Sequence, residues 1–108
     1  MSTVASGEVT TASRSVNING VAVAEGDIIG LQNGVLVVGG QSVPDVVLRL
    51  LDKMGAGDHE LVTLYSGAEV SPAAAEQLAA AIQAAYPGLG VETHAGGQPY
   101  YQYILSVE

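Results

Sequence analysis

The segment from His94 to Tyr103 holds the residue types in this chain that are best suited to chemistry or binding. Histidine is the side chain that most readily exchanges a proton near neutral pH, and His94 ends a predicted strand, where a general acid or base can be held. Tyrosine combines a large apolar ring with a hydroxyl and loses little rotamer entropy, so a tyrosine cluster favours a contact surface. We expect a binding surface made of Gly96, Gly97, Gln98, Pro99, Tyr100, Tyr101 and Tyr103.

The three tyrosines leave two interpretations open. If residues 101–107 form a strand, Tyr101 and Tyr103 share one face, and Tyr100 lies on the other face at the start of the strand. The chain contains no Phe and no Trp, so the rings of Tyr101 and Tyr103 could instead fill the core. Tyr100 and Gln98 lie in the predicted loop and are the better candidates for the surface.

His94 also has two interpretations. A catalytic role would be covalent or acid–base, but we identify no serine or carboxylate near it in the sequence that would complete a nucleophilic arrangement. A structural or interface histidine is therefore the favoured interpretation, and no other catalytic residue is expected. The spacing of the two histidines and eleven acidic residues matches no metal-ligand motif, so no metal site is expected.

The connection from Ser66 to Glu69 precedes a predicted helix, a position where α/β sheets often bind anions. It contains one glycine and no lysine, and Glu69 would repel a phosphate. It is therefore neither a phosphate-binding loop nor a dinucleotide fingerprint, and we expect an ordinary strand-to-helix connection.

Composition limits the classes of ligand and compartment. The chain has 108 residues, enough for one domain. Its formal net charge of -8 disfavours nucleic acid and anionic membranes as ligands, and it suits a partner with a basic patch. The absence of cysteine excludes thiol chemistry and fits a reducing compartment. No segment approaches the ~20 apolar residues of a membrane helix, so no membrane insertion is expected.

Residues 1–7 are expected to form a tail or linker, and residues 8–38 a β-meander. Asn19-Gly20 and Asn33-Gly34 are hairpin turn signals, because both central positions of such a turn require positive φ. The predicted strands of the meander span residues 9–13, 15–18, 21–24, 28–31 and 35–38.

The hydrophobic period changes after residue 38. Apolar residues with helical spacing follow Ser42, a predicted N-cap, and stop at Gly55. An Ala-rich helix is predicted from Ser71-Pro72 to about Tyr86. Further strands are predicted at residues 61–65, 91–94 and 101–107. The fold class is therefore α+β or α/β: a β-meander followed by β-α-β-α-β-β, with two helices on one face of a mixed sheet and the meander beside it. We expect the first three strands of this second part to be parallel and the last one antiparallel.

Two runs of sequence carry a family resemblance: INGVAVAEGDIIGLQNGVLVV, and the segment from residue 60 to the end, which finishes in ILSVE. Their most specific parts are Glu25-Gly26-Asp27, Tyr86-Pro87, and Gly96-Gly97-Gln98-Pro99 with Tyr101 and Tyr103. From about Glu8 onward the chain resembles the C-terminal domain of the large, kinase subunit of bacterial fatty acid kinases, which belong to the dihydroxyacetone-kinase-like proteins. The Ala-rich second helix and Gly39-Gly40-Gln41 depart from the family pattern.

The resemblance implies that residues 8–108 form the single C-terminal domain of a larger, cytoplasmic bacterial kinase. ATP and magnesium would be bound by another domain of that parent protein, and this domain would hold no cofactor. It would dock a DegV-like protein that carries a fatty acid, so that the fatty acid is phosphorylated by the ATP-binding domain. The domain alone would then not be an enzyme.

Two other functions stay open at this point. His94 could serve catalysis or substrate binding in a dihydroxyacetone-kinase-like enzyme, as a histidine does in some dihydroxyacetone kinases. The domain could instead serve mainly for self-association.

Overall fold

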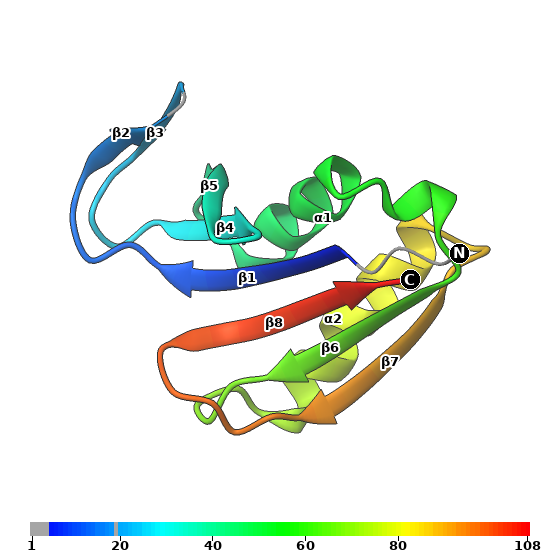
Figure 1. Ribbon diagram of the computed structural model, residues 1–108. Helices are drawn as coiled ribbons and strands as arrows, with labels where there is room; N and C mark the ends of the chain where they lie inside the picture. Colours follow the sequence, from blue (N-terminus) through cyan, green and yellow to red (C-terminus); the bar gives the residue numbers. More distant parts are fainter. Residues whose placement is uncertain (1–4, 19) are drawn as a thin grey trace.

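The computed structural model describes residues 5–18 and 20–108. Its strands are β1 Ala5–Thr11, β2 Val16–Ile18, β3 Val21–Val23, β4 Ile28–Gln32, β5 Val35–Gly40, β6 Leu61–Ser66, β7 Gly90–Ala95 and β8 Tyr101–Val107. Its helices are α1 Val43–Lys53, α2 Pro72–Ala85 and the 3-10 turn η1 Ala56–Asp58. Six strands form one mixed sheet in the order β5-β4-β1-β8-β6-β7, and β2 and β3 form a separate hairpin (Figure 1). The predicted fold class, an α+β arrangement of two helices and a mixed sheet, is confirmed.

Both helices begin where the sequence predicts. The hydroxyl of Ser42 accepts a hydrogen bond from the backbone N–H of Asp45, and Ser71 caps α2 through Ala74 in the same way. Each helix buries an apolar stripe in one core shared with the sheet: Val46, Val47, Leu50 and Leu51 from α1, and Ala75, Leu78 and Ile82 from α2. Within the described residues, neither helix is long and apolar enough to cross a membrane.

The first third of the chain does not lie beside the sheet as predicted. β1, β4 and β5 belong to the main sheet, and only the β2–β3 hairpin stands apart, packing Val23 against Leu36 and Ala12. The predicted tail is also too long, because Ala5–Gly7 already pair with β8 in β1. The rest of that tail, residues 1–4, lies outside the described residues.

The strand directions are partly as predicted. β6 and β7 pair in parallel, and β8 runs antiparallel to β6. The expectation of three parallel neighbours is wrong, because β5 is the opposite edge strand and β4, β1 and β8 lie between it and β6. The last strand also does not stay beside β7: it enters the sheet between β6 and β1.

The β4–β5 connection is the tight hairpin that the sequence predicts. Gln32 pairs with Val35, so Asn33 and Gly34 form a two-residue loop, and both have positive φ, 52° and 82°. Ile18 pairs with Val21 in the other hairpin, where Gly20 has a φ of 79° and Asn19 lies outside the described residues.

Replacing Gly34 by alanine tests the β4–β5 turn. A methyl group at this position would meet open space, so any loss of stability must come from the positive φ. We expect the free energy of unfolding to fall by about 1–2 kcal/mol in urea titration. Gly88→Ala is the matched control, since it also meets open space and has no positive φ, and it should change the free energy by less than about 0.5 kcal/mol. Equal effects of the two substitutions would contradict the turn assignment.

Candidate binding site

The loop from Gly96 to Tyr100 crosses the end of β6 on its way from β7 to β8. It has to do so because β7 and β8 lie on opposite sides of β6. Three main-chain hydrogen bonds fasten it to the β6–α2 connection: Gly97 N–H to the Ser66 carbonyl (3.0 Å), Ala68 N–H to that of Gln98 (3.0 Å) and Gly67 N–H to that of Gln102 (2.8 Å). The two connections therefore form one hydrogen-bonded unit.

Glycine is required where these two connections touch. A Cβ at Gly67 would collide with the carbonyl oxygen of Tyr101, and a Cβ at Gly96 would collide with the side-chain oxygen of Gln98. Gly97 has a φ of 68°, which favours glycine. The amide of Gln98 lies over the end of β6 and donates to the Tyr65 carbonyl at 2.9 Å. These contacts hold the loop in one conformation.

Tyr100 projects from this loop into solvent. Its side chain is 89% exposed and its φ is 72°, an unfavourable value for a residue with a Cβ. The Thr10 hydroxyl donates to its carbonyl at 2.6 Å and so holds this conformation. An exposed ring in a strained but hydrogen-bonded loop is typical of a contact residue.

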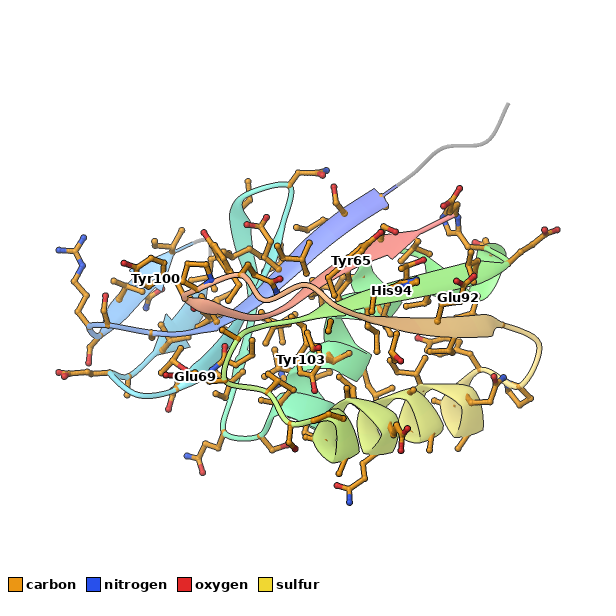
Figure 2. The ribbon with its side chains drawn as sticks, turned by 90° about the horizontal axis from the view of Figure 1, so that it is seen from below. Tyr65, Glu69, Glu92, His94, Tyr100 and Tyr103 are labelled. Carbon is orange, nitrogen blue, oxygen red and sulfur yellow. The ribbon has the colours of Figure 1, made fainter. Side chains whose placement is uncertain are left out.

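The other two tyrosines separate along β8. Tyr103 points toward the helices and is only 3% exposed, whereas Tyr101 is half-buried (Figure 2). Burial raises the pKa of the Tyr103 hydroxyl. Tyr103 is thus a core residue, and its expected place on a binding surface is corrected. The predicted Gly96–Tyr101 run does lie together at the end of the sheet.

A cavity of about 400 Å³ opens between the loop and the β6–α2 connection. Its lining consists of Thr11, Gly67, Ala68, Glu69, Val70, Gln98, Pro99, Tyr100, Tyr101 and Gln102. Sequence analysis assigned Ser66–Glu69 to an ordinary connection and did not select Thr11 or Gln102. No local signal marks these residues, because the crossing of β6 brings them together.

The cavity offers hydrogen-bond acceptors. The Gln102 amide donates to the Thr11 hydroxyl at 2.7 Å, which leaves the buried Oε1 atom of Gln102 without a partner among the described residues. Glu69 adds an exposed carboxylate at the rim. The nearby N-terminus of α2 is already capped by Ser71. The cavity therefore suits a group that donates hydrogen bonds or carries positive charge.

His94 lies on the sheet face opposite the helices, beside Tyr65 and Glu92 (Figure 2). Its ring stacks on that of Tyr65 with centroids 5.7 Å apart, and its Nε2 atom is 3.4 Å from Oε1 of Glu92. Sequence analysis overlooked this carboxylate, although a spacing of two residues in a strand puts both side chains on one face. Within the described part of the chain, no three His, Cys, Asp or Glu side chains are grouped to hold a metal ion.

Comparison with known proteins gives relatives of much greater length. Protein YloV of Bacillus subtilis is 37% identical over 105 residues, which are 97% of this chain and 19% of YloV. An uncharacterized protein of Staphylococcus haemolyticus is 35% identical over all 108 residues, which are 20% of that protein. The chain thus spans about a fifth of the length of these curated relatives.

A family comparison covers the chain from end to end. The family of FakA-like C-terminal domains, where FakA denotes a fatty acid kinase component, matches residues 1–108. This match confirms the resemblance carried by the loop motif Gly96-Gly97-Gln98-Pro99 and the hairpin run. With these motifs placed in a domain built on a six-stranded sheet, the chain belongs to the FakA-like C-terminal domain family of fatty acid kinases.

Proposed function

We propose that this domain docks a DegV-like, fatty-acid-carrying protein for a fatty acid kinase, and that it performs no phosphoryl transfer itself. The family assignment supports a kinase-family parent. The relatives are about five times longer than the matched segment, which leaves room in them for a separate nucleotide-binding domain. In this proposal the parent is a cytoplasmic bacterial enzyme whose other domain binds ATP and magnesium.

Exposed Tyr100 is the observation that carries the docking role. The chain spends backbone strain to hold a large ring almost wholly in solvent, and the neighbouring hydrogen bonds keep the loop rigid. A rigid aromatic anchor binds without a large loss of conformational entropy. We assign Gly96, Gly97, Gln98, Pro99, Tyr100 and the half-buried Tyr101 to the docking surface.

The adjoining cavity indicates the chemistry of the partner. Unpartnered Gln102 Oε1 and the carboxylate of Glu69 both favour a donor group, and the chain carries a formal net charge of -8. A lysine or arginine of the partner, placed beside the Tyr100 ring, would satisfy these acceptors. The acidic charge would also speed association at low salt.

A catalytic role for His94 is the second candidate. The contact with Glu92 favours it, since a carboxylate can orient an imidazole. The ring's described neighbours are Glu92 and Tyr65, however, and neither is placed as a nucleophile that His94 could activate. Docking therefore accounts for more of the observed geometry.

Removing the ring of Tyr100 tests the docking proposal. We expect Tyr100→Gly to weaken binding of a purified, acyl-loaded DegV-like protein from the same organism by about 2 kcal/mol, or about thirtyfold in Kd, measured by calorimetry. Stability should stay within about 1 kcal/mol of the wild type, because relief of the positive φ offsets the greater freedom of glycine in the unfolded chain.

Two further variants isolate the ring. Tyr100→Phe keeps the ring and should bind within about threefold of the wild type. Ile18→Ala removes another exposed apolar side chain, on the distant β2–β3 hairpin, and should leave affinity unchanged. The docking proposal fails if Tyr100→Gly remains folded and binds the partner as tightly as the wild type.

Nucleotide binding gives a separate prediction. We expect the isolated chain to show no saturable ATP binding in calorimetry up to about 1 mM ATP with magnesium. The cavity carries a carboxylate at its rim, Ser71 already caps the α2 N-terminus, and the net charge repels a triphosphate. A dissociation constant in the micromolar range would contradict the assignment of ATP to another domain.

A further inference from the structure

β7 is an edge strand with a free hydrogen-bonding side. It pairs with β6 along its whole length, and no described strand lies beyond it (Figure 1). Gly90 N–H bonds the Glu60 carbonyl and Gly96 N–H bonds that of Ser66. Parallel strands bond through alternate residues, so Glu92 and His94 also turn their main-chain groups toward β6. The N–H and C=O groups of Val91, Thr93 and Ala95 therefore point outward.

This edge lacks the usual features that prevent strand pairing. β7 contains no proline and no lysine, and its register with β6 runs through six consecutive pairs without a bulge. Edge strands with these properties pair readily with another strand.

The sequence of β7 is suited to pairing with itself. Around Thr93 it is nearly symmetric: an acidic residue on one side, a histidine on the other, and a small apolar residue beyond each. We propose that two copies of this chain associate through antiparallel β7 strands, with the two-fold axis at Thr93. The sheets of the two copies then form one continuous sheet.

The outward-pointing groups match this register. Thr93 faces Thr93 of the second copy, and Val91 faces Ala95 of the second copy, and these are the three residues that present their main-chain groups at the edge. Antiparallel pairing of these residues forms about six main-chain hydrogen bonds.

Charge selects this register over its neighbours. Glu92 of one copy stands opposite His94 of the second copy, in the closely spaced type of pair that forms no main-chain hydrogen bonds. A neutral imidazole can donate to the carboxylate, and a protonated one adds charge attraction. A register centred on residue 92 would instead oppose the two Glu92 carboxylates, which is unfavourable. The existing contact between Glu92 and His94 would become a four-membered cluster.

The helix side of β7 has room for the second copy. Val91 packs toward the core side, and in the proposed register the second copy's Val91 lies next to the small side chain of Ala95. A cavity of about 250 Å³ is lined there by Thr93, Ala95 and Ala75 of α2, among others. A valine from the second copy would reduce this empty space.

The expected dimer is weak. One strand pair buries little surface, and each copy carries a formal net charge of -8, so we expect a Kd on the order of 100 µM at physiological salt. Added salt should strengthen the dimer by screening the repulsion between the two copies. This sign is opposite to the salt dependence expected for docking a basic partner.

Sedimentation equilibrium of the purified chain tests the proposal. The wild type should show a monomer–dimer equilibrium at concentrations up to about 1 mM. Thr93→Pro should raise the dimer Kd at least about tenfold, because it removes an outward N–H and leaves every bond to β6 intact. Thr93→Ala keeps that N–H and should dimerise within about threefold of the wild type. Circular dichroism checks that both variants remain folded.

Charge variants test the register itself. Glu92→Lys and His94→Glu each place like charges opposite one another, so each alone should dimerise at least about fivefold more weakly than the wild type. Mixed together, the two variants should form a heterodimer in which both facing pairs are of opposite charge. Pairing between the variants that is no tighter than self-pairing would overturn the two-fold register. A wild type that stays monomeric would overturn the dimer and leave the edge to a different partner.

Discussion

The pairing of β8 with both β1 and β6 is the interaction on which the rest of the domain depends. β1, β4 and β5 lie on one side of this strand, and β6 and β7 lie on the other. Its helix-facing side chains, Tyr103, Leu105 and Val107, are buried in the core that also receives α1 and α2. The last strand of the chain therefore joins two halves that are otherwise linked mainly through packing of the helices. The core has no Phe or Trp, so this strand supplies its largest ring, Tyr103.

The position of β8 also explains the candidate docking site. A chain that leaves the edge strand β7 and enters the sheet beyond β6 must pass over the end of β6. The crossing brings the loop against Gly67, where a side chain would have no room, and requires positive φ at Gly97 and Tyr100. The strained, exposed tyrosine and the cavity beside it both follow from this topology. The site is thus a consequence of strand order, and its conformation is held by the same hydrogen bonds that complete the sheet.

Local features were predictable from the sequence, and long-range ones were not. Helix caps at Ser42 and Ser71 and the Asn33-Gly34 turn follow from short-range rules, and the structure has all three. Strand order does not follow from such rules, because alternation along a strand indicates which face is buried and says nothing about its neighbour. The meander was therefore separated from the sheet that it joins. The same limit applies to the site: Gly96–Tyr100 stood out by residue type, whereas Gln102 and Glu69 gain importance only through the crossing of β6.

The proposed docking surface and the proposed dimer edge are compatible in one assembly. Gly96–Tyr100 extends from the C-terminal end of β7, while pairing uses the side of the strand from Val91 to Ala95. Antiparallel pairing about Thr93 places the C-terminal end of one β7 beside the N-terminal end of the other. The two Tyr100 rings then lie at opposite ends of the joined edge and face away from each other, and Tyr100 itself lies outside the paired segment. A dimer built in this way would hold two partner proteins without contact between them, so that occupation of one docking surface leaves the other free.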